Sequence, residues 1–71
     1  MSTPTPEMLA AVQTFATYYG RTWKQELNGR WENGWRTGDS DWFNTAHLQQ
    51  LRNQFGPRWL TSYRLPRKTH T

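Results

Sequence analysis

A stretch of polar, non-acidic residues in the last third of the chain has the composition of a surface that reads nucleic acid. It contains the amides Gln49, Gln50 and Asn53, with the base Arg52 among them. Glutamine and asparagine can form paired hydrogen bonds with adenine, and arginine can do so with guanine. An acidic side chain would repel phosphate, and none occurs in residues 42–71. The stretch therefore predicts a helix face that binds DNA.

The positive charge of the chain is concentrated in the same region. Residues 1–41 contain four bases and five acids, whereas residues 42–71 contain five bases and no acid, and the net charge of the whole chain is +4. Such an asymmetry suggests an anionic partner at one end of the molecule. We expect the basic residues beyond the amide-rich stretch to neutralise phosphates that flank the nucleobases being read. These basic residues are Arg58, Arg64, Arg67 and Lys68.

A second group of residues is typical of protein interfaces. Trp35, Arg36 and Trp42 flank a loop rich in glycine, aspartate and serine. Tryptophan and arginine are enriched among the residues that dominate binding energy at interfaces. The alternative hypothesis is therefore a small effector that docks on a larger cellular machine through these side chains. Formation of a homodimer, which would bury exposed rings and double the basic face, is a third interpretation.

Residues that could support catalysis or bind metal are sparse. Asp39 and Asp41 form a close carboxylate pair, but they precede a predicted helix, where capping accounts for them. His47 has no acidic neighbour in the sequence, and we expect it to cover the edge of the core. Cysteine is absent and there are two histidines, too few for the usual zinc sites. The sequence predicts a non-enzymatic protein without a metal or cofactor.

Length and hydropathy limit the class of protein. A chain of 71 residues suffices for one domain, and its mean hydropathy is −1.05. No apolar run approaches the roughly 20 residues that a membrane-spanning helix needs. No signal peptide is recognisable, and the lack of cysteine is typical of a reducing compartment, so we expect a cytoplasmic protein without a membrane partner. We expect a flexible segment over 1–5, one helical domain over 6–65 and a disordered basic tail over 66–71.

The elements that must position these residues are helices. The first is predicted over residues 6–19, because Thr5 is a suitable N-cap and Gly20 a suitable C-terminal stop. An apolar stripe with helical spacing lies between them, consisting of Met8, Val12, Phe15 and Tyr19. We expect this helix to form the core.

A second helix is predicted over residues 22–33, with a capping box formed by Thr22 and Gln25. Four apolar residues spaced by four, Trp23, Leu27, Trp31 and Trp35, favour a helix. So do two pairs of opposite charge at the spacing i,i+4, which are Glu26–Arg30 and Glu32–Arg36. The dipeptides Asn28-Gly29 and Asn33-Gly34 instead favour a β-hairpin. The choice between helix and hairpin stays open over residues 28–38, with the helix favoured.

Two further helices are predicted over residues 42–55 and 57–65. Leu48, Leu51 and Phe55 lie on one face of the first, which Asp41 or Thr45 would cap. A tight turn at residues 56–57 leads to the second, which carries Trp59, Leu60 and Tyr63 on one face. The spacing therefore predicts an all-α fold, a compact bundle of three to four short helices. The last two resemble a helix-turn-helix only in outline, because Arg52 and Ser62 occupy positions where that motif needs small or apolar residues.

Overall fold

Helix α1 begins and ends where the sequence predicts. In the computed structural model, which describes residues 3–65, α1 spans Pro6–Tyr19. The Thr5 hydroxyl accepts a hydrogen bond of 3.2 Å from the backbone N–H of Met8, so this residue is the N-cap. Gly20 ends the helix with a φ of +71°, a conformation that costs glycine little. The prediction for residues 6–19 is confirmed.

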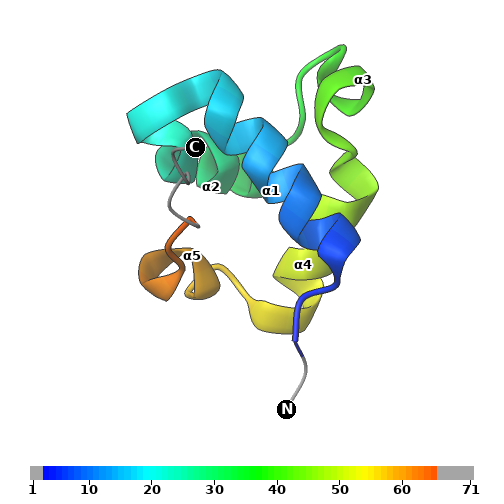
Figure 1. Ribbon diagram of the computed structural model, residues 1–71. Coiled ribbons are helices and arrows are strands. Elements are labelled where there is room, and N and C mark those ends of the chain that lie inside the picture. Colours follow the sequence, from blue (N-terminus) through cyan, green and yellow to red (C-terminus); the bar gives the residue numbers. More distant parts are fainter. Residues whose placement is uncertain (1–2, 66–71) are drawn as a thin grey trace, which may run out of the picture.

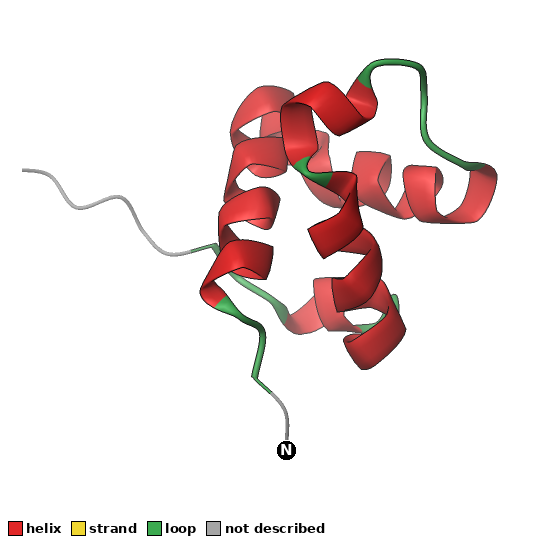
Figure 2. Ribbon diagram, turned by 90° about the vertical axis from the view of Figure 1, so that its right-hand side faces the viewer, coloured by secondary structure: helices red, strands yellow, loops and turns green. Residues whose placement is uncertain are grey.

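Residues 23–33 form a helix and not a hairpin. A single 3-10 turn, η1 (Gly20–Thr22), leads directly into α2 (Trp23–Asn33). The predicted capping box is wrong, because Thr22 belongs to the preceding turn and its side chain makes no capping hydrogen bond. Gly34, with a φ of +104°, ends the helix. Residues 34–38 then form the loop seen before the next helix in Figure 2.

The single helix predicted over residues 42–55 is in fact two helices. α3 (Asp39–Phe43) is followed by α4 (Thr45–Phe55), and Asn44 between them has a φ of +51°. On one continuous helix Phe43 and Leu48 would lie about 140° apart. The break lets both side chains enter the core, where both are buried. Neither helix has a side-chain cap, so the predicted capping by Asp41 or Thr45 is also wrong.

The last helix is shorter than its apolar pattern predicts. α5 spans Trp59–Ser62, and the chain turns to an extended conformation at Tyr63, with a ψ of 136°. At this point the Tyr63 carbonyl accepts a hydrogen bond of 2.7 Å from the Lys24 ammonium of α2. The predicted helix over 57–65 is therefore reduced to about one turn. The predicted tail over 66–71 lies outside the described residues.

Helix α1 lies at the centre and packs against α2, α3 and α4, as Figure 1 shows. In both views α3 and α5 lie at opposite ends of the molecule (Figures 1 and 2). The core combines side chains from every α-helix: Met8, Ala11, Val12, Phe15, Ala16, Trp23, Leu27, Trp31, Phe43, Leu48, Leu51 and Leu60. The structure thus confirms the all-α bundle. Among the described helices, none has the length and apolar character needed to cross a membrane.

Candidate interaction surface

A buried arginine ties α2 to the start of α3 and, through Asp39, to the loop that precedes it. Arg30 is 4% exposed, and its guanidinium donates to the Glu26 carboxylate at 2.8 Å and to the Asp39 carboxylate at 3.1 Å. It also donates to the Tyr19 hydroxyl of α1. Asp39 accepts a further hydrogen bond of 2.8 Å from the backbone N–H of Arg36. These contacts connect α1 and α2 to the loop and fix its shape.

The buried positive charge of Arg30 is paired inside the protein. Burial lowers the pKa of Arg30, but its hydrogen bonds to the carboxylates of Glu26 and Asp39 outweigh this effect and leave the pKa above its usual value. Arg30 is therefore a cation with two anionic partners. The predicted Glu26–Arg30 pair is confirmed, and Asp39 serves as a partner of Arg30 rather than as a helix cap.

Two aromatic rings stand out from the surface above this network. Tyr18 is 61% exposed and Trp42 is 65% exposed, and they are the exposed large hydrophobic residues of the described chain. Their ring centroids lie 5.8 Å apart. Tyr18 also contacts Tyr19 and Phe43, with ring centroids 4.9 and 5.6 Å away. We call this pair the Tyr18–Trp42 surface.

Two shallow hollows flank Trp42. One has a volume of about 230 Å³, and its lining includes Tyr18, Arg36 and Trp42. The other has a volume of about 270 Å³, and its lining includes Ala11, Trp42 and His47. Trp42 therefore forms a ridge between two depressions, and exposed Arg36 lies beside one of them. This shape can receive apolar side chains of a partner on either side of the indole ring.

The interface residues predicted from the sequence divide into two groups. Arg36 and Trp42 are exposed, but Trp35 is half-buried. It packs edge-on against Phe15, with ring centroids 6.4 Å apart. Tyr18 was missed, although it lies outside the apolar stripe of α1, which indicates that it faces away from the core. His47 is half-buried at the edge of the core, as the sequence predicts.

The amides predicted to bind DNA lie on the solvent side of α4. Gln49, Gln50 and Asn53 are exposed, whereas Leu48 and Leu51 on the opposite side are buried. The sequence-based prediction of an amide-rich face is consistent with this arrangement. We call these three residues the amide face.

Arg52 does not add an unpaired positive charge to this face. Its guanidinium donates to the Glu32 carboxylate and to the Trp31 carbonyl, each at 3.2 Å, and it lies 6.0 Å from the centre of the Trp31 ring. The predicted Glu32–Arg36 pair is wrong, because α2 ends at Asn33 and Arg36 lies beyond the helix. Glu32 instead binds Arg52, 20 residues away.

The predicted phosphate-binding residues are placed only in part. Arg58 and Arg64 are exposed on either side of α5. Arg67 and Lys68 lie outside the described residues. Because α5 has one turn, α4 and α5 do not form a helix-turn-helix with a second, groove-reading helix.

Comparison with known proteins gives no family. No protein-family model matches the sequence, and neither a curated protein nor a solved structure is significantly similar to the chain. Within residues 3–65, no group of three or more metal-ligating side chains comes together.

Proposed function

We propose that this protein is a small non-enzymatic regulator that binds another protein through the Tyr18–Trp42 surface. The observation that carries the proposal is the exposure of both rings. Most of the other aromatic side chains of the chain are buried or partly buried. An exposed apolar cluster rimmed by polar residues is typical of a binding site. An aromatic side chain buries roughly 150–250 Å² when a partner covers it.

The surface is held in place before any partner arrives. Phe43 lies under Tyr18 and is itself 2% exposed, while Arg30 and Asp39 fix the neighbouring loop. Little conformational entropy would be lost on binding such a preorganised surface. The chemistry of the partner follows from the lining: apolar side chains for the two hollows, and a carboxylate for exposed Arg36.

Affinity capture with a matched pair of variants tests this proposal. Purified protein is used to capture partners from nuclease-treated lysate, and each captured protein is then purified and titrated directly. We expect a stoichiometric partner that the variant Trp42→Ala binds about 30-fold more weakly, the loss typical of a central aromatic residue. The control Gln50→Ala, on the amide face, should bind normally. Equal binding by Trp42→Ala, or loss of every partner after nuclease, contradicts the proposal.

DNA binding is the second candidate function, and the amide face favours it. Gln49, Gln50 and Asn53 are exposed together on a helix without an acidic residue. Arg58 and Arg64 would supply phosphate contacts beside them, as the charge asymmetry suggests. The engagement of Arg52 with Glu32 removes one predicted guanine-binding residue from this candidate.

Anisotropy titration with duplex DNA at several salt concentrations tests the second candidate. Each phosphate contact contributes about −0.9 to the slope of log K against log salt concentration, so four or five contacts predict a slope near −4. Arg58→Gln should weaken binding to all sequences alike, whereas Gln50→Ala should alter sequence preference. Absence of binding even at low salt would exclude this function.

A further inference from the structure

A furrow separates α2 from the segment that follows α4. Its first part is a hollow of about 400 Å³ with Lys24 and Asn28 of α2 on one side and Arg58 and Thr61 on the other. A second hollow of about 480 Å³ adjoins it, because Lys24 and Thr61 line both, and it adds Arg64. Together the two hollows bring three bases to one furrow, which lies at the α5 end of the molecule (Figure 1).

No acidic residue lines either hollow within residues 3–65. The two acids of α2 are engaged elsewhere. Glu26 binds Arg30 and Glu32 binds Arg52. Lys24 and Asn28 are one helical turn apart, and Glu32, one turn beyond Asn28 on the same face of α2, lines neither hollow. The positive charge of the furrow is therefore not neutralised by the residues that line it.

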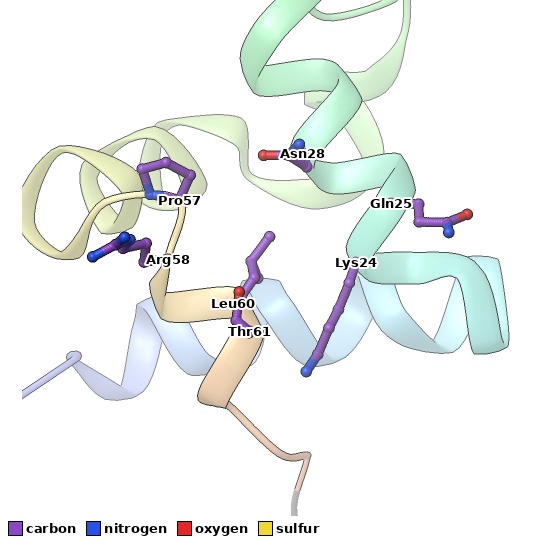
Figure 3. Close-up of a pocket in the computed structure, with 7 residues that line it drawn as sticks. All are labelled: Lys24, Gln25, Asn28, Pro57, Arg58, Leu60 and Thr61. Atoms are coloured by element: carbon purple, nitrogen blue, oxygen red, sulfur yellow. The ribbon is translucent and has the colours of Figure 1, made fainter.

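Lys24 lies where the two hollows meet and is held in position. Its ammonium donates a hydrogen bond of 2.7 Å to the Tyr63 carbonyl and lies 5.7 Å from the centre of the Trp23 ring. An ammonium has three N–H donors, so two are left for a ligand. Figure 3 shows the Lys24 side chain extending along the furrow.

The opposite wall offers further donors. Arg58 is exposed, and Figure 3 shows its guanidinium turned outward at the rim, across the hollow from Lys24. Its long side chain can rotate toward a ligand. Asn28 extends from α2 toward the Pro57 side of the hollow (Figure 3). Thr61, which lines both hollows, contributes a hydroxyl group to the same wall as Arg58.

We propose that this furrow binds a phosphate-bearing ligand. Ammonium and guanidinium groups are donors only, and they form strong charge-assisted hydrogen bonds with the anionic oxygens of phosphate. Because Lys24 and Arg58 stand on separate walls, a ligand with two phosphate groups can contact both of them. A free polyphosphate and the backbone of a single-stranded nucleic acid share this chemistry. The proposal does not depend on the Tyr18–Trp42 surface or on the amide face, since none of their residues lines the furrow.

Titration of the whole protein with two probes tests this inference. Sodium tripolyphosphate is one probe, and a single-stranded oligonucleotide of about 10 nucleotides is the other. Binding is followed at low ionic strength by two-dimensional amide NMR, which reports the affected residues individually. We expect saturable shifts at Lys24, Asn28 and Thr61 with at least one probe. The probe that binds more tightly identifies the source of the phosphate.

Matched charge variants decide the result. Arg58→Gln should weaken binding roughly tenfold, as expected for the loss of a hydrogen bond to a charged group. Arg36→Gln removes the same charge from exposed Arg36, which does not line the furrow, and should change binding much less. Equal weakening by both variants, or no saturable shift with either probe, overturns the proposal. Lys24→Gln is a second variant and should also weaken binding. Because Lys24 also bonds to the Tyr63 carbonyl, thermal unfolding is used to check that this variant is folded.

Discussion

Arg30 and Arg58 have the same side chain in opposite environments. Arg30 is buried among two carboxylates and a phenol, whereas Arg58 is exposed at the rim of a furrow without an acid. The difference shows that a count of bases along the chain does not measure the charge available to a partner. Arg52, in the basic part of the sequence, is engaged by Glu32, while Lys24, in the near-neutral part, joins Arg58 and Arg64.

The aromatic residues show the same division. Trp23 and Trp31 of α2 are buried in the core, whereas Trp42 of α3 projects from the surface. Burial of the first two contributes to folding, while exposure of the third leaves apolar area for a partner. Variants that remove a buried group should therefore reduce stability, and variants of exposed groups should reduce binding alone.

Replacement of Arg30 should have the largest effect on stability. Arg30→Ala leaves the buried carboxylate of Asp39 without its cation and breaks the links to Glu26 and Tyr19. Loss of one partner of a buried ion pair costs about 3–5 kcal/mol. That equals the entire stability expected of so small a core, so we expect the variant to be largely unfolded at room temperature. Circular dichroism during urea titration measures the fraction of folded protein and the free energy of unfolding.

The matched control for that experiment is Arg58→Ala. Arg58 is exposed, and substitutions of such residues usually change the free energy of unfolding by less than about 0.5 kcal/mol. A cooperative urea transition of Arg30→Ala within about 1 kcal/mol of the unmodified protein would show that the buried network is not needed for folding.

Replacement of Arg52 should have an intermediate effect. Arg52 is partly exposed, and its bond to the exposed carboxylate of Glu32 is weakened by solvent. The hydrogen bond from Arg52 to the Trp31 carbonyl contributes further stability. We therefore expect Arg52→Ala to lower the free energy of unfolding by about 1 kcal/mol. Equilibrium urea unfolding of Arg52→Ala, Glu32→Ala and the double variant measures the coupling between them. A loss as small as that of Arg58→Ala would mean that Arg52 is free to bind a partner.

The smallest effect is a loss of stability at high pH. Burial raises the pKa of Tyr63, so the folded protein keeps this proton at a pH where the unfolded chain, with a pKa of about 10, releases it. The contribution to stability is fully present below pH about 10 and is lost as the pH rises through the folded-state pKa. Urea midpoints between pH about 9 and 11 should fall more for the unmodified protein than for Tyr63→Phe. Parallel curves would contradict the prediction.

Much of the local structure could be predicted because it depends on neighbouring residues. The N-cap at Thr5, the stop at Gly20 and the Glu26–Arg30 pair all involve groups within a turn or so of each other, and all three are confirmed. The break at Asn44 could not be predicted in this way. It follows from the need to bury both Phe43 and Leu48, which depends on where α1 lies.

The sequence by itself determined the helical fold, the helix over residues 6–19 and the exposed amides of α4, because residue spacing defines which side of a helix is apolar. The tertiary structure decided which bases are engaged and which rings are exposed. Glu32 binds Arg52 across 20 residues, and Lys24 meets Tyr63 across 39 residues. Tyr18 meets Trp42 through the packing of α3 on α1. Such partners depend on the packing of distant segments, which spacing along one helix does not encode.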